Sequence, residues 1–271
     1  MLVSESEQVA SLYDSPEGQL GPILFGGHLH WGYWDENNAD DNFAAAADRL
    51  AQIMIDKVQI QEGQRFIDLG CGVGQPAMRL AKAKGCLVDG ITISKFQQQS
   101  ATSKAQAEGM QDKLRFIHGS ALDIPSEDQT YDGGWFFESI FHMGHRDALL
   151  EANRVLKPGA TLVLTDLPTL PTTTEEFKAF VQQHIHSSFI AKEDYPDLMA
   201  ETGFELVGID EITENVMPWL VPKFKETIEE HKQKITELLN DTADKAIDDW
   251  VYLFEYMSEN LGYMVVTARK L

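Results

Sequence analysis

The chain has 271 residues, of which 43% are hydrophobic and 24% charged, and its formal net charge is −21. This length and composition are those of an ordinary globular protein with a sizeable hydrophobic core. No apolar run reaches the ~20 residues that cross a bilayer, which excludes a membrane helix, and so acidic a surface repels the phosphate backbones of DNA and RNA.

The cysteines and the first residues indicate the compartment. Cys71 and Cys86 are the only cysteines, which are too few for a disulfide framework, and no Cys/His cluster has the spacing of a zinc site. The opening residues MLVSESEQ lack the basic start and the apolar stretch of a secretory signal. We therefore expect a cytoplasmic protein without a metal site.

The negative charge is concentrated at the two ends of the chain. Residues 1–62 carry a net charge of −9 and residues 168–271 one of −11, whereas residues 63–167 are nearly neutral at −1. Such a surface suits a cationic or neutral small molecule better than a diphosphate. The sequence gives no indication of the oligomeric state.

Residues 1–43 form an N-terminal arm rich in glycine, aspartate, asparagine and aromatic residues. Its centre reads GGHLHWGYW over residues 26–34. An arm of this composition is expected to fold over the functional site and exclude water, and simple packing of its aromatic rings onto the core is the alternative. The helical spacing of Ala47, Leu50 and Met54 then predicts a helix over 44–58.

From Gln64 onward, short apolar strands alternate with helices, which is typical of a parallel sheet built from βαβ units. The expected strands are 65–69, 86–93, 114–118, 131–137 and 161–167. The expected helices are 76–84, 95–108 and 145–156. Lys157-Pro158-Gly159 ends the last helix, because proline cannot continue it and glycine permits the reversal.

After residue 167 helices interrupt this alternation. Residues 168–176 predict a helix start, because threonines precede two glutamates of a first turn. The elements expected next are a helix at 194–202, a strand at 204–213, a helical region at 217–260 and a strand at 262–269. We therefore predict the following divisions of the chain: a core over 44–167, a substrate lid over 168–261 with late core elements at 194–214, and a final core strand within 262–271.

The segment FIDLGCGVGQP (66–76) is decisive for the function. Gly70, Gly72 and Gly74 follow the end of a strand, and a helix opens near Pro76. Glycines allow the backbone to approach a ligand closely, and a helix N-terminus favours negative charge. A loop of this kind fits either a dinucleotide or S-adenosylmethionine.

The details of the loop favour S-adenosylmethionine. A dinucleotide loop has its third glycine one position later and an acidic residue ~20 positions further on. Asp89 has that separation but lies in the middle of a strand, whereas Asp68 directly precedes the glycines. The Asp68 carboxylate can orient the loop and lie near the ammonium group of S-adenosylmethionine. An NAD-dependent dehydrogenase stays open as the competing interpretation.

Four segments resemble the successive motifs of class I S-adenosylmethionine-dependent methyltransferases. They are DLGCGVG (68–74), GITISKFQ (90–97), YDGGWFFESIFHM (131–143) and RVLKPGA (154–160). Within that superfamily the chain is similar to a small-molecule branch that includes the rebeccamycin sugar O-methyltransferase, sarcosine/dimethylglycine methyltransferases and tocopherol-type methyltransferases. The resemblance implies an α/β fold with a Rossmann-like, seven-stranded, mostly parallel sheet, one antiparallel strand, a helical lid and an N-terminal arm.

The resemblance also implies which residues bind S-adenosylmethionine. They are Tyr13, Tyr33, Asp68, Gly70, Gly72, Gly74, Thr92, Gln97, Ser120, Ala121, Leu122 and Phe137. Thr92 and Gln97 are expected near the ribose, and Ser120, Ala121 and Leu122 beside the adenine. Many family members hold the ribose hydroxyls with an acidic residue at the position of Thr92, which the GITISxxQ subgroup lacks. Many also have an aspartate at the position of Ser120 to accept from the adenine amino group, so adenine recognition here is expected to depend on backbone groups.

Two titratable residues follow the carboxyl ends of strands that should be neighbours, where the sites of open α/β sheets lie. We expect His142 to be a general base and Asp166 its orienting carboxylate, as the resemblance to the rebeccamycin-type enzyme implies. Such a base contributes roughly 10²–10⁴-fold to the transfer of a hydroxyl proton. A structural hydrogen bond for His142 and a strand-end cap for Asp166 are the alternatives. Glu138 is expected to contact the backbone or the arm.

These observations predict an S-adenosylmethionine-dependent methyltransferase that acts on a small molecule, with O-methylation of a natural-product or sugar-like hydroxyl as the first interpretation. Methylation of carbon or nitrogen is the second, because neither needs a strong base. A protein that binds the cofactor without transferring a methyl group is the third. Lid helices within 223–257 are expected to supply an apolar wall for the acceptor, whose identity the sequence does not reveal.

Overall fold

A seven-stranded sheet organises the fold. In the computed structural model, which describes residues 5–271, the strands lie in the order β3-β2-β1-β4-β5-β7-β6. They are β1 (Arg65–Leu69), β2 (Leu87–Thr92), β3 (Leu114–His118), β4 (Tyr131–Phe136), β5 (Leu156–Asp166), β6 (Phe204–Glu211) and β7 (Met264–Lys270). β7 is antiparallel to both of its neighbours, and the other pairs are parallel. The predicted Rossmann-like fold is confirmed.

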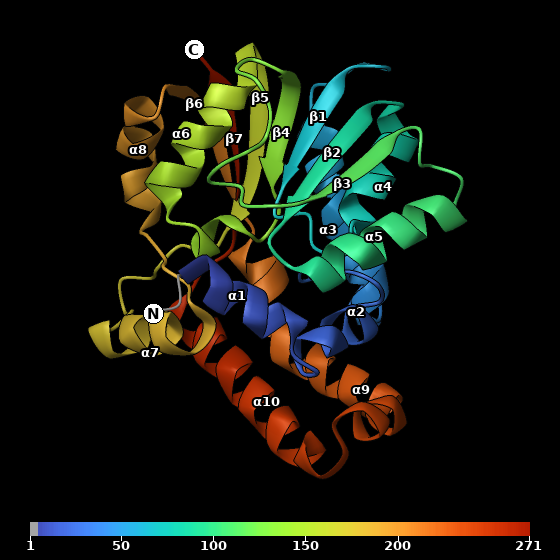
Figure 1. The fold of residues 1–271 in the computed structure, drawn as a ribbon. Coiled ribbons are helices and arrows are strands. Elements are labelled where there is room, and N and C mark those ends of the chain that lie inside the picture. The colour runs from blue at the N-terminus through green and yellow to red at the C-terminus, as the bar shows by residue number, and fades with distance from the viewer. Residues whose placement is uncertain (1–4) are drawn as a thin grey trace.

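Helices cover both faces of this sheet (Figure 1). They are α1 (Glu5–Asp14), α2 (Gly21–Leu24), α3 (Phe43–Lys57), α4 (Gln75–Lys84), α5 (Lys95–Ala107), α6 (His145–Val155), α7 (Glu175–Ile185), α8 (Tyr195–Glu201), α9 (Thr213–Leu239) and α10 (Ala243–Asn260). Among the described residues no helix has both the length and the apolar character to cross a membrane.

The protein has one hydrophobic core on each face of the sheet. Residues of a strand contribute to the two cores in turn, because successive side chains point to opposite faces. Trp135 of β4 and Val163 of β5 pack into the core with α3 and α4. Their neighbours Phe136 and Leu164 pack into the core with α6 and α8. Both faces are therefore buried, as expected for strands that read as continuous apolar runs.

Two expected elements differ from the structure. β5 begins at Leu156, so Lys157-Pro158-Gly159 lie inside the strand, next to a shift of register between Tyr131 and Gly133 of β4. The helical region expected at 217–260 is a hairpin of α9 and α10, because the chain reverses at Asn240, whose φ is 50°. The threonine cap of α7 is as predicted, since the Thr174 side chain accepts a hydrogen bond from the amide of Phe177.

The arm and the hairpin lie on the same side of the molecule. In Figure 1, α1 lies between the sheet and the α9–α10 hairpin. Two hydrogen bonds fasten the end of α1 to the core: Ser94 donates to Asp14 over 2.5 Å, and the hydroxyl of Tyr13 lies 3.0 Å from Nε2 of His142. The arm therefore reaches the edge of the sheet where the strand-end loops gather.

Candidate functional site

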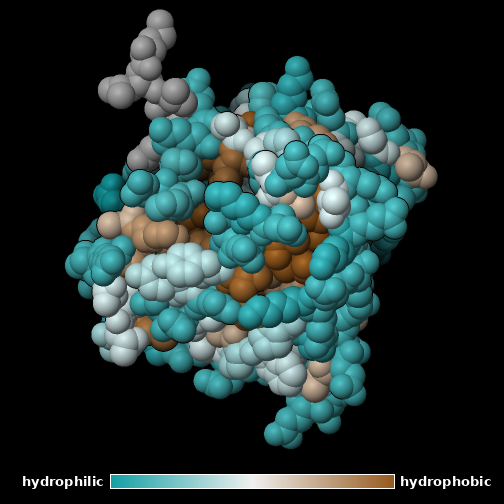
Figure 2. All heavy atoms as spheres, turned by 90° about the horizontal axis from the view of Figure 1, so that it is seen from below, coloured by the Kyte–Doolittle hydropathy of each residue, from teal (hydrophilic) through white to brown (hydrophobic). Residues whose placement is uncertain are grey.

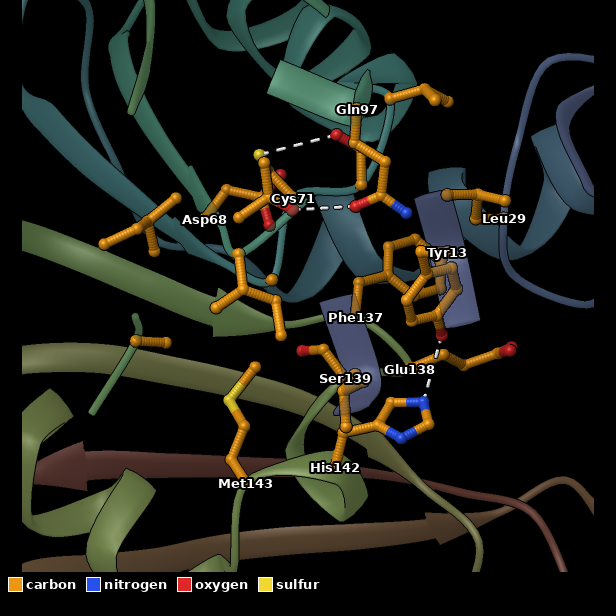
Figure 3. A pocket seen from close by; sticks show the side chains of 18 of the residues that line it. Tyr13, Leu29, Asp68, Cys71, Gln97, Phe137, Glu138, Ser139, His142 and Met143 are labelled. Atoms are coloured by element: carbon orange, nitrogen blue, oxygen red, sulfur yellow. Dashed lines mark hydrogen bonds between the residues drawn. The ribbon is translucent and has the colours of Figure 1, made fainter. Parts of the chain in front are cut away.

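A pocket lies beyond the carboxyl ends of β1, β2, β3 and β4, and we call it the loop pocket (Figure 3). It encloses about 900 Å³, counted to its open mouth. Loops after these strands form most of its wall, and α1 contributes Val9 and Tyr13. The predicted site residues that line it are Tyr13, Asp68, Gly70, Gly72, Thr92, Gln97, Ser120, Ala121, Leu122, Phe137 and His142.

The three glycines after β1 have different tasks. Their φ angles are 86° at Gly70, 51° at Gly72 and 77° at Gly74, a region that other residues rarely adopt. Gly70 and Gly72 line the loop pocket, whereas Gly74 is the N-cap of α4. A Cβ atom at Gly74 would lie 2.6 Å from the ring of Phe116. The structure thus assigns Gly74 to the turn and its packing instead of the pocket wall.

Asp68 presents an unpaired carboxylate to the loop pocket. Its side chain is buried, and among residues 5–271 neither oxygen accepts a hydrogen bond of good geometry; the indole N–H of Trp135 is a nearby donor and lowers the pKa of the carboxyl group in part. Burial raises the pKa of this carboxyl group to about 7. A buried polar group without a partner is unfavourable by a few kcal/mol, so this position favours a ligand that brings a cation or a donor. The ammonium group of S-adenosylmethionine meets that requirement.

Thr92 and Gln97 form a second polar element of the wall. The Thr92 hydroxyl donates to Oε1 of Gln97 over 2.7 Å. This bond fixes the carboxamide so that its amide nitrogen faces the pocket (Figure 3). The backbone amide of Gln97 is in turn bound by Ser94, which caps α5. The oriented NH₂ group is suited to an oxygen acceptor such as a ribose hydroxyl.

Asp89 does not serve the role that a dinucleotide would require. Its carboxylate accepts hydrogen bonds from Arg65 over 2.6 Å and from Nε of Arg115 over 2.9 Å, and a third from the Tyr131 hydroxyl over 2.8 Å. These groups occupy the side chain in the middle of β2, away from the loop pocket. The acidic residue expected by the dehydrogenase interpretation is therefore engaged elsewhere.

His142 ends a short 3₁₀ turn after β4 and is held at both ring nitrogens. Nε2 lies 3.0 Å from the Tyr13 hydroxyl, and Nδ1 lies 2.9 Å from Oγ of Ser187. The Ser187 hydroxyl also lies 3.1 Å from the carbonyl of Ile185, and in the tautomer in which Ser187 donates to that carbonyl, Nδ1 carries the ring hydrogen and Nε2 accepts from Tyr13. Burial lowers the pKa of His142 to about 4. The ring is neutral at neutral pH, and in this tautomer it has a lone pair on Nε2.

The expected pairing of His142 with Asp166 is wrong. Asp166 is fully buried and accepts hydrogen bonds from His145 over 2.8 Å and from Tyr195 over 2.6 Å. The physical reason is the alternation of β5, which turns residue 166 toward the core beneath α6 and α8, on the same face as Leu164. Asp166 thus links the end of β5 to α6 and α8 by hydrogen bonds, and it does not line the loop pocket.

Tyr33 also lies outside the loop pocket, contrary to expectation. Its backbone amide donates to Ala46, and its carbonyl accepts from Arg49, both in α3. These bonds hold residue 33 on the α3 side of the core, away from the strand-end loops. Other arm residues do reach the pocket: His30 lines it and stacks on Phe137, with ring centroids 3.9 Å apart.

Sequence reasoning missed several apolar residues of the wall. Val9, Leu29 and Met143 line the loop pocket, yet a single aliphatic residue in a helix or loop carries no functional signal. Leu29 stands between two histidines whose chemistry is more conspicuous. Only its place within the aromatic segment of the arm indicated its location.

A second pocket, which we call the apolar pocket, adjoins the first. It spans about 920 Å³, counted to its open mouth, and shares Tyr13, Leu29, Glu138 and His142 with the loop pocket. The remaining wall is largely apolar and includes Phe25, Trp31, Phe141, Trp250, Leu253, Phe254 and Met257. Figure 2 shows a hollow with a hydrophobic floor and a hydrophilic rim on the side of the hairpin. The two pockets meet where the polar groups gather.

Glu138 lies at this junction and contacts the arm, as expected. Its Oε1 accepts hydrogen bonds from the backbone amide of Trp31 over 2.8 Å and from the hydroxyl of Tyr263. Burial raises the pKa of its carboxyl group to about 8. Among residues 5–271 no group of three or more His, Cys, Asp or Glu side chains is arranged to hold a metal ion.

We expect Glu138→Gln to stabilise the protein at alkaline pH. Because the folded-state pKa is raised to about 8, the folded chain keeps a proton between about pH 5 and pH 8 that the unfolded chain loses. The free energy of unfolding therefore falls as the pH rises through this window. Glutamine keeps both hydrogen bonds and removes this loss, by roughly 2–4 kcal/mol at pH 8.5.

Urea unfolding of both proteins at pH 5.5, 7.0 and 8.5 measures this difference. The exposed Glu127→Gln removes an equal charge and serves as the control. A difference between Glu138→Gln and the parent protein that stays constant from pH 5.5 to 8.5 would contradict the assignment.

Comparison with known proteins identifies the family. Residues 67–164 match the family model of a methyltransferase domain. The (+)-O-methylkolavelool synthase of Herpetosiphon aurantiacus is 33% identical over 97% of this chain and 93% of its own. The 27-O-demethylrifamycin SV methyltransferase of Amycolatopsis mediterranei is 30% identical over 91% of each.

The solved structure of the cyclase SpnF superposes on this fold with a TM-score of 0.84, at 27% identity, and covers 100% of this chain and 98% of that one. Relatives that match nearly from end to end share the arm and the hairpin as well as the sheet. On this basis the protein belongs to the class I S-adenosylmethionine-dependent methyltransferases and uses S-adenosylmethionine as its cofactor.

Proposed function

We propose that the protein transfers a methyl group from S-adenosylmethionine to a hydroxyl group of a largely apolar small molecule of the natural-product class. One observation carries the proposal: the imidazole of His142, with the Tyr13 hydroxyl at its Nε2, lies where the loop pocket meets the apolar pocket. The names of the two relatives described above both specify a methyl group on oxygen, which supports oxygen as the acceptor atom.

The loop pocket is proposed to hold the cofactor through groups of this chain. Asp68 binds the ammonium group, and the amide nitrogen of Gln97 binds a ribose hydroxyl. Ser120, Ala121 and Leu122 flank the adenine along the loop after β3. Bound there, S-adenosylmethionine supplies an electrophilic methyl group on a sulfonium.

His142 is proposed to take the proton of the acceptor hydroxyl. For this the hydroxyl replaces the Tyr13 side chain as the partner of Nε2. Hydrogen bonding to the backbone of His186 and Ile185 favours the protonated ring and opposes the effect of burial in part. A base whose pKa is lowered to about 4 is weak, so alignment of the reacting atoms supplies most of the rate, and the base adds to it.

The alternatives are distinguished by one assay. Radioactive methyl transfer from S-adenosylmethionine into an organic extract of metabolites, followed by identification of the labelled atom, separates O-, N- and C-methylation. The likeness to the cyclase SpnF gives a specific reason to test for a protein that binds the cofactor without transferring the methyl group. Tight binding without any labelled product would establish that case.

The two cysteines are free and buried, which fits a reducing compartment such as the cytoplasm.

We expect Asp68→Asn to weaken the binding of S-adenosylhomocysteine by about 10- to 100-fold, because a charge-assisted hydrogen bond is lost. In the parent protein the affinity should rise with pH up to about 7, since the ammonium group binds the ionised carboxylate. The variant should lack this pH dependence. Isothermal calorimetry between pH 5.5 and 8 measures both effects, with the exposed Asp112→Asn as the control. An unchanged affinity would remove Asp68 from this role.

We expect His142→Gln to lower the rate of labelled methyl incorporation by about 10²-fold or more, with little change in cofactor affinity, because only the proton acceptor is removed. The exposed His184→Gln is the matched control, since its ring is bound to the backbone carbonyl of Phe180, stacks on the ring of that residue and does not line the loop pocket. Full activity of His142→Gln would show that alignment alone drives the reaction.

A further inference from the structure

A segment of the arm, residues 28–30, forms part of the wall of the loop pocket. Leu29 and His30 line this pocket, and Leu29 also lines the apolar pocket. Leu29 packs directly on the loop 70–74, which we call the glycine loop. A Cβ atom added at Gly72 would lie 2.8 Å from Cδ1 of Leu29, and the three heavy atoms nearest to it would all belong to Leu29. In Figure 3, Leu29 lies on the same side of the pocket as Tyr13, so the arm covers the glycine loop there.

This segment is anchored by His28, a buried residue that lines neither pocket. Its Nε2 lies 2.9 Å from Oδ1 of Asp48 in α3, and its Nδ1 lies 2.8 Å from Nε2 of His30. The His30 ring is held in turn by the carbonyl of Trp31, 2.8 Å from its Nδ1, and by its stack on Phe137. The two imidazoles therefore join the arm to α3 and fix the residue that stands between them.

Asp48 extends this connection to the helix that follows the glycine loop. The same Oδ1 forms an ion pair with Nη1 of Arg79 over 2.7 Å, and Arg79 belongs to α4, which begins where the glycine loop ends. Gly72 and Leu29 are thus positioned relative to each other along two routes. One route runs through α4 and Arg79 to Asp48, and the other runs from Asp48 through His28 into the arm. Loss of the second route frees Leu29 to move away from the glycine loop.

We infer that His28 is a positioning residue of the cofactor site: it lines neither pocket, but its bond to Asp48 holds Leu29 against the glycine loop, and this closed wall retains the bound nucleoside. The role is separate from the proposed proton transfer, which does not use His28. It is also independent of the methyl acceptor, because the binding of S-adenosylhomocysteine alone measures it.

Calorimetry and stopped-flow kinetics of S-adenosylhomocysteine binding to the full chain test the inference. His28→Leu removes the imidazole and keeps a buried apolar side chain. We expect it to raise the dissociation constant by about 10-fold or more, because a buried hydrogen bond to a charged group is lost. The increase should come from faster dissociation, since the wall retains a ligand that is already bound. An unchanged dissociation constant, or one that rises through slower association alone, overturns the inference.

His145→Leu is the matched control. His145 is also buried and lies 2.8 Å from a carboxylate, that of Asp166, but it lines neither pocket. Both variants lose a buried contact between an imidazole and a carboxylate, so urea unfolding should show that both are destabilised. Only His28→Leu should bind S-adenosylhomocysteine more weakly. An equal loss of affinity in the two variants would reflect lower stability alone and overturns the inference.

A double-mutant cycle tests the route through Leu29. In a Leu29→Ala background, His28→Leu should cost less than about 3-fold in affinity, because the side chain that His28 positions has been removed. Fully additive effects overturn this route.

His28→Gln keeps a donor toward Asp48 and should stay within about 3-fold of the parent protein. A glutamine variant that binds as weakly as His28→Leu overturns the role of this bond. If His28→Leu does not fold, Asp48→Asn at its half-exposed position replaces it, with an expected loss of affinity of about 3-fold or more.

Discussion

The buried carboxylate of Asp68 is the constraint on which the site depends. It lies at the end of a central strand, where a parallel sheet directs its loops to one edge, and among the described residues no donor gives its oxygens a hydrogen bond of good geometry, although the indole of Trp135 lies near. Without a ligand this arrangement is unfavourable, and the raised pKa is its direct expression. The buried carboxylate therefore lowers the free energy of unfolding of the ligand-free protein, and a ligand that brings a cation or a donor removes this unfavourable contribution. Binding of the cofactor and the stability of the loop are coupled in this way.

Around this point two chemically different spaces meet. The loop pocket displays backbone groups, an oriented amide and a carboxylate, as a polar nucleoside requires. The apolar pocket displays mainly aromatic and aliphatic side chains of the arm and the hairpin. Four residues belong to both, and three of them, Tyr13, Glu138 and His142, are half-buried titratable groups whose pKa values shift in the direction of the neutral form. A neutral junction suits a reaction in which the positive charge of a sulfonium disappears.

Much of this could be predicted from the sequence, because the predictive signals were local. The glycines after β1 and the alternation of strands and helices predicted the parallel sheet. Once the strand ends were known, the residues that follow them could be predicted to line the loop pocket. The pairing of His142 with Asp166 failed because it depends on which way a strand-end side chain points, and β5 turns residue 166 into the core. The prediction that Tyr33 lines the cofactor site was wrong, because the composition of the arm does not determine the path of its backbone over the core. Leu29 and the reversal at Asn240 depend on tertiary packing, for which the sequence holds no comparable pattern.

The hydrogen bond between Tyr13 and His142 has a consequence for the order of events. In the resting protein a phenol of the arm already occupies the acceptor side of the imidazole, as a built-in mimic of an alcohol substrate. An alcohol that binds Nε2 must displace this phenol, while Asp14, the next residue of the same helix, accepts a hydrogen bond from Ser94, the N-cap of α5. An alcohol that reaches Nε2 therefore breaks one of the two hydrogen bonds that fasten the end of α1 to the core, so the seating of this helix depends on whether the acceptor site is filled.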